Sequence, residues 1–226
     1  MIHLVAQASN PIIRWEYIID EWDQIQAALI EHLELTVYSV ALGLVVSAGL
    51  SAIALRYRWT TAPINGFTAF LYTIPSVALF GILVPYFGLS RITAVLPLAA
   101  YTLLILVTNI VAGFNSVSPA VREAANGMGM TPASRIIRVE LPLAMPYIVA
   151  GLRVAVVSTV GLVTVAAIIG QGGLGRLILD GLRRTFWTPM TIGATLSIVV
   201  ALALDGLIVI GGWRLTPWAR RTRGVA

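Results

Sequence analysis

The sequence predicts an all-α protein that crosses a membrane several times. Of its 226 residues, 58% are hydrophobic and only 11% are charged, and the mean hydropathy is +0.89. Because a soluble domain carries about 25% charged residues, this chain has too few to cover a solvated surface. Its apolar residues gather in five stretches, and a polar segment with several Gly and Pro residues separates the third from the fourth. These observations predict a polytopic membrane protein with a structured loop.

The five apolar stretches predict five membrane-spanning helices, since a bilayer core about 30 Å thick needs roughly 20 apolar residues per helix. Pro75 and Pro85 interrupt the second stretch, and such helices tolerate proline where neighbouring groups satisfy the freed carbonyls. The predicted spans are residues 35–55, 64–87, 92–114, 147–169 and 192–213.

Residues 1–34 form an N-terminal segment of different composition. Six acidic residues lie between positions 14 and 34, among aromatic and aliphatic ones. Ile18, Trp22, Ile25 and Leu29 recur at spacings of three and four, which predicts an amphipathic helix. Trp and Tyr anchor well at membrane interfaces, so we expect this helix on the outer surface of the membrane rather than in a ligand site.

The distribution of arginine predicts the orientation. All 15 basic residues are arginines, and nine of them lie in the loop after the first span, in the polar segment or in the C-terminal tail, residues 214–226. Five lie on the opposite side. Because positive residues concentrate in cytoplasmic loops, we expect the N-terminus outside and the C-terminus on the cytoplasmic side.

What the sequence lacks excludes several kinds of chemistry. It has no lysine and no GxxxxGK[ST] loop, so the chain cannot hydrolyse ATP by itself. It has no cysteine, which excludes thiolate catalysis and disulfides, and His3 and His32 fit no metal-ligand pattern. We therefore expect no catalytic residue and no metal site. The net charge of +5 reflects membrane orientation, so nucleic acid is not an expected partner.

The polar segment, residues 118–142, contains two helix starts. Ser118-Pro119 and Thr131-Pro132 each place a capping side chain before a proline at the first helical position. The Gly-rich residues 127–129 separate the two predicted short helices, and Pro142 is expected to close the second. Such a polar, compact segment between two spans is suited to contact a partner outside the lipid.

The same segment resembles the EAA loop of ATP-binding cassette importer permeases. The matching residues are Glu123-Ala124-Ala125, Gly129, Val139 and Leu141-Pro142, with Val139 where the family usually has isoleucine. Two further runs look like the quaternary-amine branch, which imports glycine betaine, carnitine and choline. They are Tyr72-Thr73-Ile74-Pro75-Ser76 in the second span and Ile169-Gly170-Gln171-Gly172-Gly173-Leu174-Gly175 after the fourth. The resemblance covers about residues 30–213.

The resemblance implies a transport subunit of the type I importer fold in a bacterial cytoplasmic membrane, driven through this loop. In such permeases the EAA segment is a coupling helix that docks in a groove of a separate ATPase. Glu123, Ala124, Ala125 and Gly129 would make that contact, and Val139 belongs to the same motif. Leu141-Pro142 would end the coupling segment and set the direction of the fourth span. The alternative, a plain connecting loop, does not explain the spacing.

The implied partners follow from the same resemblance. Two copies of the ATPase would bind the ATP, so this chain needs no cofactor of its own. A second permease subunit, identical or paralogous, would complete the membrane part within the lipid. An extracytoplasmic binding protein would deliver the solute.

Several residues inside the spans are candidates for the translocation path. Ionisable residues within spans are costly and are functional hypotheses by default. Asp205 is the clearest: it can pair with Arg153 as a structural ion pair, the reading favoured here, or face a water-filled path. Asn109 is expected to bond a neighbouring helix. Three aromatic residues could contact a quaternary ammonium through cation–π attraction: Tyr72, Tyr101 and Trp187. Pro75 is a candidate because it belongs to the Tyr72–Ser76 run described above.

A run of glycines after the fourth span predicts either an outer gate or a simple tight turn. It consists of Gly170, Gly172, Gly173 and Gly175. Three rivals to osmoprotectant import stay open. One is a permease for methionine or another small solute. The others are a membrane scaffold and an intramembrane enzyme, which would need a second carboxylate beside Asp205.

Overall fold

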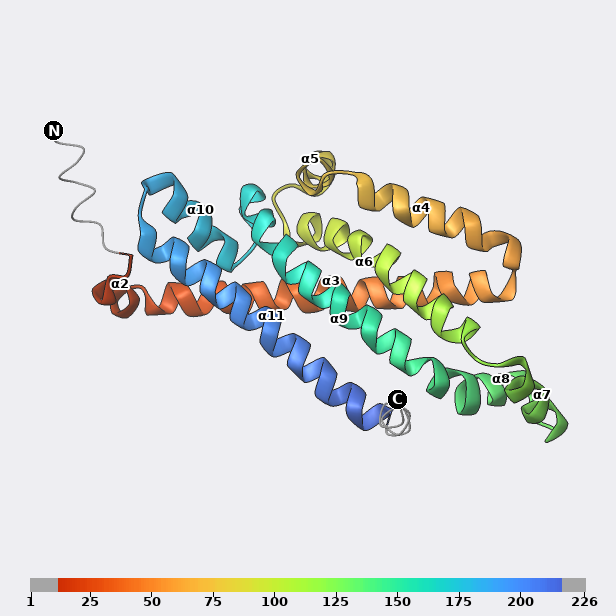
Figure 1. The fold of residues 1–226 in the computed structure, drawn as a ribbon. Coiled ribbons are helices and arrows are strands. Elements are labelled where there is room, and N and C mark those ends of the chain that lie inside the picture. Colours follow the sequence, from red (N-terminus) through yellow and green to blue (C-terminus); the bar gives the residue numbers. More distant parts are fainter. Residues whose placement is uncertain (1–11, 217–226) are drawn as a thin grey trace. The chain divides into compact units, whose positions relative to one another are not determined.

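The computed structural model describes residues 12–216, and within that range the chain is helical and contains no strand (Figure 1). The tail residues 217–226, with Arg220, Arg221 and Arg223, lie outside the described residues, as does His3. The helices in chain order are α2 (Trp15–Asp20), α3 (Trp22–Arg56), η1 (Arg58–Thr60), α4 (Thr61–Thr73), α5 (Ser76–Phe87), α6 (Arg91–Asn115), α7 (Pro119–Gly127), α8 (Pro132–Arg135), η2 (Ile136–Glu140), α9 (Leu141–Val165), η3 (Ala166–Ile169), α10 (Leu174–Arg184) and α11 (Trp187–Leu215).

Four helical stretches are long and apolar enough to cross a bilayer, and a bent pair supplies the fifth predicted span. The four are Trp22–Arg56, Arg91–Asn115, Pro132–Ile169 and Trp187–Arg214, and the pair is Arg58–Thr73 with Ser76–Phe87. The pair bends by 91° where Pro75 precedes α5. Pro85, in contrast, lies inside α5 without breaking it. The break at Pro75 is thus confirmed, whereas the expected break at Pro85 is wrong.

No helix break separates the predicted N-terminal segment from the predicted first span. Helix α3 runs without interruption through residues 34 and 35, and only the short α2 precedes it. The ring of Tyr17 in α2 meets Phe186 edge-on, with centroids 5.2 Å apart, and burial raises the pKa of Tyr17. Of the predicted apolar stripe, Ile25 is buried, whereas Trp22 is exposed.

The chain divides into two compact units, each with its own core. The first contains the described residues up to Val40, with Ile74–Ala99 and Ser158–Ala203. Its core includes Leu35, Phe80, Ala94, Leu98, Val163, Ala166 and Ile169. The second contains Ala41–Thr73, Ala100–Val157 and the described residues from Leu204. Its cores form around Ala54, Val107 and Val111, and around Leu106, Ile110 and Ala155.

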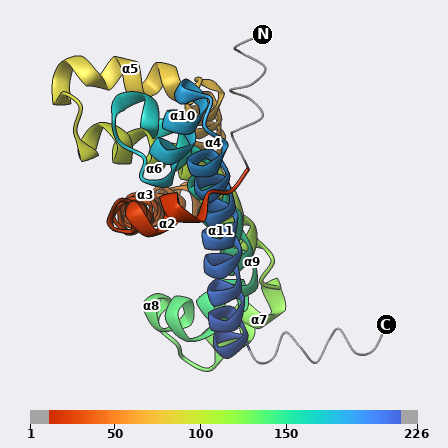
Figure 2. The same ribbon diagram turned by 90° about the vertical axis from the view of Figure 1, so that its left-hand side faces the viewer.

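In the first unit, the glycine run after η3 packs tightly against α3. Gly172 and Gly173 have φ angles of 119° and 49°, in the region that favours glycine. The backbone N–H of Gly172 donates to Glu31, 3.2 Å away, and Arg176 pairs with the same carboxylate. The turn leads into α10, which lies alongside the first half of α11 (Figure 2). The turn is therefore held by a side chain of α3.

A methyl group added at Gly173 is expected to disrupt this packing. An ideal Cβ there would lie 2.4 Å from the Ala28 carbonyl oxygen and 2.5 Å from the His32 nitrogen. Gly173→Ala should therefore cost at least about 1–3 kcal/mol, the usual penalty of overpacking. Thermal unfolding in detergent measures it. Gly161→Ala, where nothing lies within 4 Å of the added carbon, is the matched control. Equal melting temperatures would contradict the packing argument.

Candidate functional site

The polar segment between α6 and α9 folds as two short helices joined by a turn, as predicted. Helix α7 begins with Pro119 at its first position, but the Ser118 side chain makes no capping bond, so that part of the prediction is wrong. The second start is confirmed, because the Thr131 hydroxyl accepts from the Ser134 N–H at 3.3 Å. Gly129 has a φ of 76° in the turn between them, a conformation that glycine adopts at little cost.

The EAA residues differ in exposure. Glu123, Ala124 and Gly129 are exposed, and so are available to a partner. Ala125 is 1% exposed, because it faces the inside of the loop. Its small side chain thus allows α7 to pack within the chain, and a direct docking contact by Ala125 is not what this structure supports.

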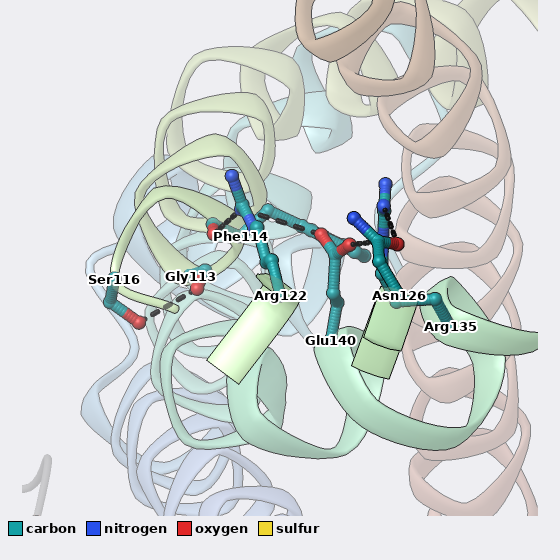
Figure 3. A network of polar contacts seen from close by, with 7 residues as sticks. All are labelled: Gly113, Phe114, Ser116, Arg122, Asn126, Arg135 and Glu140. Carbon is teal, nitrogen blue, oxygen red and sulfur yellow. Dashed lines mark hydrogen bonds and ion pairs between the residues drawn. The ribbon is translucent and has the colours of Figure 1, made fainter. Parts of the chain in front are cut away.

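Glu140, which the motif does not include, is a buried carboxylate at the centre of the loop (Figure 3). Its side chain is 7% exposed. Arg135 Nε donates to Oε1 at 2.7 Å, and an Arg122 guanidinium nitrogen lies 3.3 Å from Oε2. A buried carboxylate needs such partners, because moving its charge from water into the protein costs free energy that nearby positive charges must offset.

The two arginines extend this network to the neighbouring segments. Arg122 also donates to the carbonyl oxygen of Phe114, near the end of α6, at 2.6 Å. Arg135 donates to the Asn126 side-chain oxygen in α7 at 2.7 Å (Figure 3). Glu140 therefore connects α6, α7, α8 and the start of α9 through two arginines.

Pro142 does not close the second short helix, contrary to the prediction. The chain stays helical from Pro132 to Ile169, with a π-helical turn at Ile136–Glu140. The N–H of Leu141 donates to the Ile136 carbonyl, five residues back. This wider turn lies immediately before Pro142, whose missing N–H and ring would otherwise disturb a regular α-helix. The loop is thus continuous with α9 and can move with it.

A cavity of about 940 Å³ lies between the loop and the second unit's long helices. Its apolar wall comes from α3, α6 and α9, through residues such as Leu44, Ile110 and Ile148. Its polar wall contains Glu140 and the four arginines Arg56, Arg58, Arg122 and Arg135. The Glu140 network therefore borders open space on one side.

The predicted pairing of Asp205 with Arg153 is confirmed. Arg153 donates two hydrogen bonds to the carboxylate, at 2.7 and 2.8 Å. This is the bidentate geometry that suits a planar guanidinium and a carboxylate. The pair joins α9 to α11 within the second unit.

The remaining path candidates of the second unit fall into two places. Tyr72 and Tyr101 meet edge-on with ring centroids 5.7 Å apart. Asn109 donates to the Ile105 carbonyl of its own helix at 2.8 Å, so the expected bond to a neighbouring helix is wrong. Helix α9 nevertheless passes close to this residue, since an added Cβ at Gly151 would lie 2.5 Å from the Asn109 Cβ. Pro75 belongs to the first unit.

The structure adds Arg122, Asn126, Arg135 and Glu140 to the residues found by sequence reasoning. Their signal in the sequence is weak. A glutamate between Val139 and Leu141, at the entrance to an apolar span, is the one anomaly that could have drawn attention.

Several apolar helices joined by a structured polar loop define a multi-pass membrane protein. Residues 39–218 match the family described as "Binding-protein-dependent transport system inner membrane component". The chain belongs to this family of importer permeases, and it is a multi-pass protein of the inner membrane.

The curated relatives cover most of the chain. It is 36% identical over 197 residues to the osmoprotectant import permease protein OsmW of Salmonella typhimurium, covering 85% of this chain and 92% of the relative. It is 33% identical over 189 residues to the choline transport system permease protein OpuBB of Bacillus subtilis, covering 83% and 86%.

Solved structures share the fold. The permease fold of the MetNI methionine ABC transporter, in an inward-facing conformation, matches with a TM-score of 0.70 at 21% identity, over 88% of this chain and 97% of that one. An amino acid ABC transporter crystallised with histidines matches with a TM-score of 0.69 at 19% identity, over 89% and 99%. These likenesses confirm the type I importer permease fold.

Proposed function

We propose that this chain is the permease subunit of an ATP-binding cassette importer for quaternary-amine osmoprotectants such as glycine betaine, choline and carnitine. The observation that carries the proposal is the similarity to OsmW and OpuBB over more than four fifths of the chain. The EAA spacing and the helical loop that presents it support a role driven by an external ATPase.

The mechanism begins at the exposed face of α7. Glu123, Ala124 and Gly129 would contact the ATPase, while Ala125 packs inside the loop. Closure of the ATPases would displace α7, and the Glu140 network would carry that displacement to α9 and α6. Val139, Leu141 and Pro142 lie in the helical junction that moves with it. Rigid-body motion of this kind produces alternating access.

The assembly follows from this mechanism. Two ATPase copies bind the ATP, and two permease subunits form the path, with an external binding protein delivering the solute. The partner ATPases supply the ATP site and the catalysis, and this chain acts as the transport subunit. The loop and the C-terminus face the cytoplasm, and the N-terminus faces outward, in keeping with the distribution of arginine.

Uptake by the reconstituted complex tests the proposed function. Proteoliposomes with the permease, its ATPase and its binding protein should accumulate radiolabelled glycine betaine, choline or carnitine only when ATP is enclosed. Methionine is the comparison solute, because the MetNI transporter shares the fold. Accumulation of methionine alone would replace the proposed substrate class. Failure to accumulate any of the four solutes would overturn the import assignment itself.

A further inference from the structure

The Arg153–Asp205 pair lies deep within its two helices. Arg153 is the central residue of α9 (Leu141–Val165), and Asp205 stands ten residues before the end of α11 (Trp187–Leu215). At 1.5 Å per residue, ten residues correspond to about 15 Å of helix. Both helices belong to stretches apolar enough to cross a bilayer. The two charges therefore lie at the level of the hydrocarbon core.

The pair is also open to its surroundings. The side chain of Arg153 is 44% exposed and that of Asp205 is 26% exposed. Val157, which lies one helical turn from Arg153 on the same face of α9, is exposed as well. Lipid tails cannot solvate an ion pair, and charged groups at this depth face a bundle interior or a water-filled cavity. Something more polar than lipid must therefore cover this face.

We propose that Arg153 and Asp205 line the water-filled translocation path and form a transient binding point for a zwitterionic solute that carries a quaternary ammonium and a carboxylate. This inference rests on the proposed function and narrows its substrate class. Arg153 binds the carboxylate of the solute, and Asp205 faces the ammonium.

The chemistry of the pair suits such a solute. The guanidinium already holds a carboxylate through two parallel hydrogen bonds, so it can accept the carboxylate of the solute in the same geometry. A quaternary ammonium has no N–H to donate, so it needs only the negative charge of Asp205. The solute replaces one ion pair with two, and no charge is left unpaired when it leaves. Binding is thus weak enough to permit release.

Glycine betaine and choline separate this role from a structural one. Both carry the quaternary ammonium, but choline has a hydroxyl in place of the carboxylate. Arg153→Gln should therefore lower the ratio of glycine betaine to choline uptake in proteoliposomes of the whole complex by about tenfold, because it removes one partner of a close charge pair. Asp205→Asn should lower the uptake of both solutes. A purely structural pair would reduce both solutes equally in Arg153→Gln, and that result overturns the proposal.

Cysteine labelling tests the location without relying on transport. The chain contains no cysteine, so Val157→Cys provides a single thiol one helical turn beyond Arg153. A membrane-impermeant thiol reagent should modify it in the assembled complex. Leu207→Cys is the matched control, exposed but displaced by two residues from Asp205 and so on another side of α11.

The two experiments fail independently. An unreactive Val157→Cys would show that a protein surface or lipid covers the pair, and it would overturn the inference even where wild-type uptake is normal. A reactive Val157→Cys in a complex that imports neither solute would instead overturn the proposed function.

Discussion

Glu140→Ala is expected to weaken the coupling of transport to ATP hydrolysis strongly while leaving the spans folded. The substitution removes the carboxylate that Arg122 and Arg135 both contact, so two guanidinium groups lose their shared partner. Breaking a buried ion pair costs about 3 kcal/mol of stability at the lower end of the known range. The lower end applies here because the side chains of Arg122 and Arg135 are 34% and 25% exposed. With the network broken, α7 can move without carrying α9. ATP hydrolysis should continue, and uptake per ATP should fall by about tenfold or more.

The measurement is the ratio of solute accumulated to ATP hydrolysed in proteoliposomes. Glu140→Gln keeps the shape and one acceptor oxygen, so an intermediate ratio is expected. Arg138→Ala is the control, since Arg138 is an exposed arginine of the same helical turn. A wild-type ratio in Glu140→Ala would show that Glu140 has no part in coupling, whatever its contribution to stability.

Hydropathy could predict that the spans exist, but not where every helix ends. Helix α3 continues through acidic residues that composition places outside the membrane. Two of these acidic residues have partners in the fold: Glu31 pairs with Arg176, and Glu34 pairs with Arg91 at 2.8 Å. Those partners come from α10 and α6, far along the chain. A single sequence does not contain the information that would assign them.

In the candidate site, too, some features could be predicted from the local sequence and others could not. The cap at Thr131 and the break at Pro75 follow from local backbone chemistry, and both are confirmed. The pairing of Arg153 with Asp205 was predictable because two opposite charges inside apolar helices strongly favour pairing. The contacts of Glu140 were not, since its polar surroundings already allowed a solvated glutamate. The π-helical turn before Pro142 was not predicted either, although the missing N–H and the ring of proline disturb a regular α-helix.

The second large effect is expected at the exposed face of α7. Glu123→Lys reverses a charge on the surface proposed to dock the ATPase, and Glu123 is exposed in the chain. Like charges juxtaposed in an interface cost several kcal/mol, so the affinity for the ATPase should fall by at least about tenfold. Co-purification of the ATPase with tagged permease measures this loss, and ATP-driven uptake should fall with it. Asp23→Lys, an exposed acidic position at the start of α3, is the control for a general charge effect.

Crosslinking distinguishes a docking surface from a loop that merely needs its glutamate. In this cysteine-free chain, Ala124→Cys places a thiol on the exposed side of α7, whereas Ala125→Cys places one on the buried side, a single residue away. A short thiol-reactive crosslinker should join Ala124→Cys to the ATPase and leave Ala125→Cys largely unreacted. Equal yields would mean that α7 is not ordered as the structure shows. Capture of the external binding protein at Ala124 would place the loop on the opposite side of the membrane, and capture of lipid alone would place α7 in the bilayer. Either result would show that the proposed drive through α7 is wrong.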